Sequence, residues 1–155
     1  MKEILINYST IIIFLHIFSA IIWIGGMIAI RVAVHPVLQS FEDNVLKLGT
    51  TLRIVGRLFN LVIPFIIFLI LTAIIFETVF GIKSNLVHIK EAIWTIMTIN
   101  FIIMYIKRSK AQKLFNNGKI ADARDMVAII PKALLPINIA LGVLATVLGV
   151  VLRGF

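Results

Sequence analysis

Residues 8–34 read YSTIIIFLHIFSAIIWIGGMIAIRVAV and decide the fold class of this chain. The stretch has one histidine in its interior and one arginine near its end, and its other residues are apolar, small or hydroxyl-bearing. At 1.5 Å per residue, a helix of this length crosses the roughly 30 Å hydrocarbon core of a bilayer. His16 then lies inside the membrane, where an ionisable side chain is costly and marks a candidate functional site.

The composition indicates a polytopic membrane protein. Of the 155 residues, 61% are hydrophobic, against roughly 45–50% in soluble proteins, and only 14% are charged. The net charge of +8 would suggest a nucleic-acid partner in a soluble protein. Here the basic residues cluster between apolar spans, so membrane topology and anionic lipid headgroups explain the charge, and no nucleic-acid partner is expected. The absence of cysteine excludes disulfides, thiol catalysis and thiolate-held metal sites from the chain's own residues.

Four apolar spans are expected, within a single domain that covers residues 1–155. They lie at about residues 8–34, 58–80, 86–106 and 133–152. Because lipid offers the backbone no hydrogen-bonding partner, apolar spans of this length are helices. The expected fold is therefore all-α, a bundle of four transmembrane helices with short interfacial helices.

The connections between the spans carry most of the polar residues. Pro36 is expected to end the first span, because proline does not continue a helix. Residues 37–57 are amphipathic and predict a short interfacial helix that runs into the second span, where Pro64 is a candidate kink. Residues 107–132 are basic and polar, and Asn116-Asn117-Gly118 predicts a turn within them.

The distribution of Lys and Arg predicts the orientation. Eleven of the 15 lie in or beside the connections that follow the first and third spans. The other four are Lys2, Lys83, Lys90 and Arg153. Because cytoplasmic loops are enriched in Lys and Arg, we expect the basic loops to be cytoplasmic and both termini to lie outside an inner (cytoplasmic) membrane.

One face of the first span combines polar and bulky side chains. Trp23 and Met27 follow His16 by seven and eleven residues, which places the three on one helical face. Gly25 and Gly26 lie at mid-depth beside them. These glycines permit either close helix packing or the approach of a flat ligand to the backbone. In the fourth span, Gly142, Ala145 and Gly149 share one face and predict tight helix packing.

A second histidine opens the third span. With the predicted orientation, His88 falls on the same side of the membrane as His16. Two imidazoles from different helices are what a six-coordinate haem b requires, so this pair is a candidate axial ligand set. The alternatives are an interhelical hydrogen bond for His16 and a solvated ring for His88. Lys90 and Glu91 come next in the sequence. Their candidate roles are a proton-transfer pair, a propionate clamp or ordinary charges at the membrane interface.

The other end of the first span carries Arg31 and His35, four residues apart. Together they would suit a carboxylate, either a haem propionate or a substrate acid, and the alternative is snorkelling at the interface. Three methionines, Met27, Met97 and Met104, are soft ligands that with histidine could handle Cu(I), or they fill gaps in apolar packing. Asn100 and Asn138 predict hydrogen bonds between helices.

The stretch LHIFSAIIWIGG, with His16, Trp23 and the Gly25-Gly26 pair, resembles the first helix of two related families of small membrane proteins. One is the HemJ family of protoporphyrinogen IX oxidases, and the other is the copper-resistance CopD family. The stretch LVHIKEAIW, with His88 and Lys90, resembles the His-x-Lys start of the third HemJ helix. HemJ carries a Pro-Arg-Leu-Phe type run before its second histidine, where this chain has IAIRVAVHP.

The HemJ resemblance implies a haem b membrane redox protein, an oxidoreductase that takes a porphyrin-type substrate and passes electrons to a partner. It implies roles for His16, His88 and Lys90, and weaker ones for Arg31 and His35. The CopD resemblance implies a copper-transport or copper-resistance protein instead. A third hypothesis is a non-catalytic assembly or subunit protein. Three histidines allow one bis-histidine haem, and a second haem would need methionine or a neighbouring subunit, which keeps a homo-oligomer among the alternatives.

Overall fold

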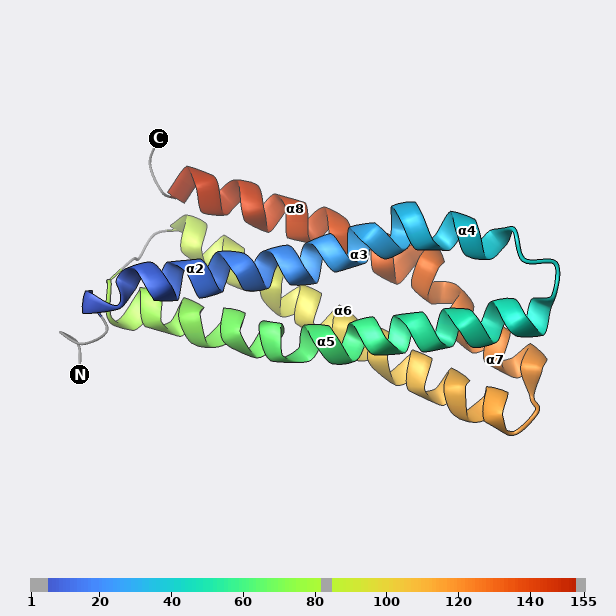
Figure 1. The fold of residues 1–155 in the computed structure, drawn as a ribbon. Helices are drawn as coiled ribbons and strands as arrows, with labels where there is room; N and C mark the ends of the chain where they lie inside the picture. The colour runs from blue at the N-terminus through green and yellow to red at the C-terminus, as the bar shows by residue number, and fades with distance from the viewer. Residues whose placement is uncertain (1–5, 82–84, 153–155) are drawn as a thin grey trace.

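The computed structural model describes residues 6–81 and 85–152, and within them it has helices and no strand (Figure 1). Four helical rods are long and apolar enough to cross a membrane: Ser9–Gln39, Asn44–Thr78, Asn85–Asn116 and Ile120–Leu152. Many large apolar side chains along these rods are exposed, as expected where helices face lipid. The expected all-α, four-helix membrane fold is confirmed.

Two of the rods change helix type along their length. The first consists of α2 (Ser9–Ala20), the π-helical turn η1 (Ile21–Gly25), α3 (Gly26–Ala29), the π-helical turn η2 (Ile30–Val34) and α4 (His35–Gln39). The second and third are the single helices α5 (Asn44–Thr78) and α6 (Asn85–Asn116). The fourth consists of α7 (Ile120–Ile129), η3 (Ile130–Leu134) and α8 (Leu135–Leu152).

The first rod does not end at Pro36, so that expectation is wrong. The rod continues to Gln39, and its turn just before the proline is a π-helix. A proline ring clashes with the carbonyl four residues earlier, which for Pro36 is that of Val32, inside η2. The fourth rod repeats the arrangement, since the carbonyl four residues before Pro136 belongs to η3. At both prolines, the carbonyl that would clash thus lies in a widened, π-helical turn. The helical rods continue past Pro36 and Pro136.

Within the segment 37–57, residues 44–57 are helical and run without a break into the second span, as predicted, and together with it they form α5. The side chain of Asp43 caps this helix, and its carboxylate accepts hydrogen bonds from the backbone N–H groups of Val45 and Leu46 at 2.7 and 3.1 Å. From there α5 runs without interruption for 35 residues, through Pro64. The second rod is therefore longer than the predicted span and starts earlier.

The predicted turn at Asn116-Asn117-Gly118 is confirmed. It separates α6 from α7, and Gly118 has φ of +75°, a conformation that glycine adopts without a steric cost. Gly81, at the end of α5, has φ of +65°. The rest of the predicted turn after it, residues 82–84, and the basic residues Lys2, Lys83 and Arg153 lie outside the described residues.

Small residues let the rods approach, as predicted for the fourth span. A Cβ atom on Gly142 would lie 2.8 Å from Cγ1 of Ile24 and 3.2 Å from Cε of Met97, so α8 is in close contact with the first and third rods. A Cβ on Gly26 would lie 2.8 Å from the side chain of Leu58. Gly25 has no neighbour within 4 Å of such an atom. Of the two glycines, Gly26 thus serves helix packing.

Arg108 of α6 packs against Gly56 of α5 and joins these two helices. The guanidinium of Arg108 fills the space beside this glycine, where a Cβ atom would collide with it. Its Nε and Nη2 atoms donate to the backbone carbonyl of Leu52 at 2.9 and 2.7 Å, and Nη2 also donates to Gln112 Oε1. A carbonyl oxygen has two lone pairs, so one lone pair of Leu52 can take the helical bond while the two guanidinium N–H groups share the other.

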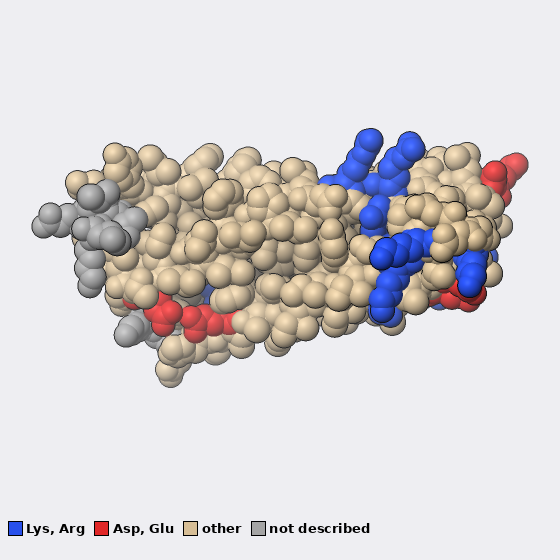
Figure 2. Space-filling view, turned by 90° about the horizontal axis from the view of Figure 1, so that it is seen from below, with Lys and Arg blue, Asp and Glu red and all other residues tan. Residues whose placement is uncertain are grey.

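The two ends of the bundle differ in charge (Figure 2). Lys and Arg side chains gather in a band toward the end that holds α4 and α7, which we call the basic end. The opposite end, where Ile6 and Leu152 bound the described chain, we call the terminal end (Figure 1). Between the band and the terminal end, the surface in Figure 2 is largely uncharged. This uncharged stretch is the part of the bundle that suits the hydrocarbon core.

Candidate functional site

His16 on α2 is held against α5 by a hydrogen bond between helices. Its Nδ1 atom lies 2.7 Å from Oγ1 of Thr72, and its ring meets that of Phe76 edge to face at 5.1 Å. The Thr72 hydroxyl donates its single proton to the backbone carbonyl of Phe68, also at 2.7 Å. In the tautomer that carries its proton on Nδ1, His16 donates to the Thr72 oxygen. In the neutral ring, the lone pair is then on Nε2.

This arrangement explains how a histidine is tolerated inside an apolar helix. Thr72 is 5% exposed and sits in the helix interior, where a threonine hydroxyl commonly bonds back to a carbonyl of the preceding turn. Its oxygen keeps acceptor capacity, and His16 uses it. The expected alternative, an interhelical hydrogen bond for His16, is thus present, and Nε2 stays available for a further ligand.

Lys90 brings a positive charge into the same part of the bundle. It extends from α6 toward α8, and its Nζ atom lies 3.0 Å from the position that a Cβ on Gly149 would take. The side chain is half-buried, and Lys90 lies five residues from the start of α6, at the end of the bundle where α2 also begins. Within residues 6–81 and 85–152, Lys90 forms no ion pair and no hydrogen bond through its ammonium group. The result is a partly desolvated cation without an anion.

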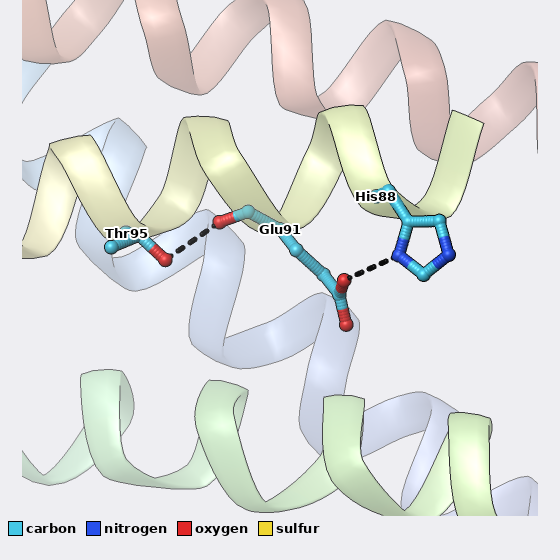
Figure 3. Close-up of polar contacts among 3 residues, drawn as sticks. All are labelled: His88, Glu91 and Thr95. Carbon is cyan, nitrogen blue, oxygen red and sulfur yellow. Dashed lines mark hydrogen bonds and ion pairs between the residues drawn. The ribbon is translucent and has the colours of Figure 1, made fainter. Parts of the chain in front are cut away.

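Glu91 forms no ion pair with Lys90 among the described residues. Its carboxylate turns to His88, with Oε2 3.0 Å from Nδ1 of the ring (Figure 3). The His88 side chain is 64% exposed, in keeping with the solvated alternative. Thr95 donates to the backbone carbonyl of Glu91 on the same side of α6. The structure thus gives His16 and His88 different partners, and no contact joins the two rings.

Trp23 and Met27 lie in the interior, as their shared face with His16 predicts. Their side chains are 3% and 1% exposed, and the indole of Trp23 meets Phe101 edge to face at 6.1 Å. Ser19, which belongs to no motif of the sequence, is also fully buried on this face. Its Oγ and the Nε1 of Trp23 have no hydrogen-bond partner among the described residues. Because Ser19 follows His16 by three residues, its position in the sequence already predicts that it lies on the same helical face.

A polar contact joins three rods deeper in the bundle, as predicted for the two asparagines. The amide of Asn100 donates to Asn138 Oδ1 at 2.9 Å and to the carbonyl of Leu134 at 2.8 Å. Asn138 Nδ2 in turn lies 3.7 Å from the sulfur of Met27. Met27, Met97 and Met104 are all at most 2% exposed. These contacts fit the packing interpretation of the methionines.

Arg31 and His35 lie in the first rod toward the basic end. Arg31 is exposed, and His35 is half-buried with its Nε2 atom 3.3 Å from the side-chain amide of Gln39. Neither forms an ion pair with an acid of the described residues. They are separated from His16 by several turns of one helix, so the two groups form separate sites.

Side chains that could bind a metal do not gather in large groups among the described residues. In the part of the chain that the structure describes, no three His, Asp or Glu residues come together as a metal site. Two apolar grooves, of about 340 and 250 Å³, lie along α6, and neither is lined by His16 or His88. The strongest candidate site is therefore His16 with Thr72 behind it and Lys90 near it.

No protein-family model matches the chain, and no match was found among curated proteins or solved structures.

Proposed function

We propose that this chain is a haem b-binding redox protein of the membrane, with Nε2 of His16 as an axial ligand. The observation that carries the proposal is the 2.7 Å hydrogen bond between Nδ1 of His16 and Oγ1 of Thr72. Histidines that bind metals almost always donate their other ring N–H to a neighbouring acceptor, which fixes the tautomer and the ring orientation. Thr72 has this role here, and it leaves a neutral nitrogen of the kind that haem iron takes.

The charge of Lys90 supports the same proposal. Haem propionates and porphyrin-type substrates carry carboxylates, and these need cationic partners in a low-dielectric site. Lys90 is half-buried near His16 and has no anion partner among the described residues. Gly149 leaves room for its ammonium group on the face of α8. In the proposed function, Lys90 holds a carboxylate and offsets the cost of its own burial by doing so.

The protein's own residues divide the work in this proposal. A b-type haem supplies one-electron transfer between a substrate and an acceptor. His16 binds and orients, Thr72 fixes its tautomer, and Lys90 positions an acidic group. Together with the resemblance of LHIFSAIIWIGG to HemJ, this makes a porphyrinogen oxidase the favoured activity. His88 stays a predicted second ligand through its Nε2 atom, because Glu91 accepts from Nδ1 and leaves Nε2 free.

The bound metal and the activity can be tested together. We expect the protein purified in detergent to contain haem b, and its gene to restore growth to a strain that lacks porphyrinogen oxidase. Bound haem without complementation would indicate an electron-transfer cytochrome. Bound copper without haem would favour the CopD-type alternative, with His16 and the methionines as soft ligands. A protein with neither would favour a non-catalytic subunit.

We further propose that the basic end is cytoplasmic, in an inner membrane. Support comes from the band of Lys and Arg at that end and from the enrichment of these residues in cytoplasmic loops (Figure 2). A C-terminal reporter that is active only outside the cytoplasm is expected to be active, and a reporter that requires the cytoplasm is expected to be silent. The reverse pattern would place His16 in the inner half of the bilayer.

A further inference from the structure

Two polar atoms on the interior face of the first rod have no hydrogen-bond partner among the described residues. They are Oγ of Ser19 and Nε1 of Trp23, and the two side chains are 0% and 3% exposed. Most buried polar groups in proteins have a partner, and a buried tryptophan N–H usually finds one. Because an unpaired buried donor or acceptor costs free energy, two such atoms on one helical face indicate a polar partner that is not a side chain of the bundle.

The hydroxyl of Ser19 differs from most buried or half-buried hydroxyl groups of these helices. Six threonines donate to the backbone carbonyl four residues earlier, which is a common arrangement in a helix: Thr51, Thr72, Thr78, Thr95, Thr98 and Thr146. The equivalent acceptor for Ser19 is the carbonyl of Leu15, and no hydrogen bond joins these two described residues. The Ser19 hydroxyl is therefore available to a partner outside its own backbone.

Ser19 and Trp23 are placed so that one small molecule can contact both. They are one helical turn apart on the same face, where Cβ atoms lie about 5–6 Å apart. Long side chains in helices point back toward the preceding turn, which for Trp23 is the turn that contains Ser19. A water can bridge two polar atoms that do not bond directly, at about 2.7–3.0 Å from each. Trp23 also lies in the π-helical turn η1, a kind of turn that is frequent at functional sites.

The chemistry of the two groups and the packing around them select a water molecule as the occupant. The indole N–H is only a donor, so the occupant must accept a hydrogen bond, whereas the hydroxyl can either donate or accept. The occupant must also be small, because Trp23 belongs to the packed core, where its ring meets that of Phe101. Neither of the two apolar grooves is lined by Ser19 or Trp23. Water meets these requirements and occurs in protein interiors about once per 27 residues.

We infer that Ser19 and Trp23 bind an internal water molecule in the membrane-spanning part of the first rod. The water accepts from Nε1 of Trp23 and forms a second hydrogen bond with Oγ of Ser19. It extends the polar part of the interior face by two turns beyond His16, since Trp23 follows His16 by seven residues. The site uses neither His16 nor Lys90, so it is independent of the proposed haem.

Oxygen-17 magnetic relaxation dispersion of the protein in detergent tests the site, because it detects water oxygens held inside a protein and is blind to exchanging hydroxyl protons. Ser19→Ala removes the hydroxyl, and Trp23→Phe removes the N–H but keeps an aromatic ring to pack on Phe101. We expect each variant to lower the dispersion amplitude by the contribution of one water, and the double variant to lower it no further. The control Thr78→Val removes a hydroxyl that bonds within its own helix at the end of α5, and it is expected to keep the wild-type amplitude.

The site is overturned if Ser19→Ala and wild type have the same amplitude, which would indicate a dry interior or a direct bond between Ser19 and Trp23. An equal loss in Thr78→Val would also overturn it, because that result indicates a general change in hydration.

Stability provides a second readout, in which the sign of the effect decides. In a dry interior, Ser19→Ala removes an unpaired hydroxyl and stabilises the protein, whereas with a bound water it removes a hydrogen bond and destabilises it. We expect the midpoint of unfolding by added denaturing detergent to fall in Ser19→Ala and in Trp23→Phe. The double variant is expected to fall by less than the sum, because both changes affect one water. A midpoint of Ser19→Ala at or above that of wild type, or additive shifts, would contradict the site.

Discussion

Replacing Gly56 by leucine is expected to destabilise the basic end of the bundle by about 2–4 kcal/mol. The new side chain would occupy the space that the guanidinium of Arg108 fills, and it would break the bonds from Nε and Nη2 to Leu52. Overpacking costs about 1–3 kcal/mol, and hydrogen bonds to a charged group are worth about 1.5–3 kcal/mol. A gain of about 1 kcal/mol in helix propensity offsets part of this loss.

The matched control is Gly25→Leu, because no atom lies within 4 Å of a Cβ placed on Gly25. Unfolding in a mild detergent, followed by circular dichroism against added denaturing detergent, measures both changes. We expect Gly25→Leu to be neutral or slightly stabilising. A double-mutant cycle with Arg108→Leu is expected to give less than the sum of the single effects, since both variants remove one contact. Equal stability of the Gly25 and Gly56 variants would contradict the contact between Arg108 and Gly56.

Replacing Thr72 by valine is expected to lower the affinity for haem about 10–100-fold, the usual cost of losing a partner behind a metal ligand. Valine keeps the shape of threonine and removes the oxygen that accepts from Nδ1 of His16. The ring then loses its fixed tautomer and orientation. Haem titration of the apoprotein in detergent, followed by absorbance, measures the change.

Thr98→Val is the control for this experiment. The Thr98 hydroxyl donates to the carbonyl of Trp94 in its own helix, and it makes no hydrogen bond to another helix. We expect its haem affinity to stay close to that of wild type. If the two valine variants bind haem equally, Thr72 has no role in orienting His16.

The sequence predicts the rods better than their ends. Apolar length alone specifies four helices, and Asn-Asn-Gly specifies the turn at Gly118. Pro36 was misleading because the general rule for proline describes a regular α-helix, whereas Val32, four residues earlier, lies in a π-helical turn. The amphipathic pattern of residues 37–57 predicts the helix at the start of α5, and the cap at Asp43 sets the residue at which it begins.

For the candidate site, the helical spacing of residues in the first rod predicted which of them share one face. It could not predict which residues of other helices they contact. His16, Trp23 and Met27 share the interior face, as seven-residue and eleven-residue spacings require. Thr72 gave no signal, because a threonine in an apolar helix usually bonds to its own backbone, as it also does here. The partner of Glu91 depends on side-chain rotamers, which a sequence pattern does not specify.

The most direct measurement of the central claim is a reduced-minus-oxidised absorption spectrum of the purified protein. We predict a b-type band in wild type that is lost in His16→Ala and retained in His35→Ala, which removes a histidine toward the opposite end of the same rod. A colourless wild-type protein, or a band that survives in His16→Ala, would contradict the assignment of His16 as the haem ligand.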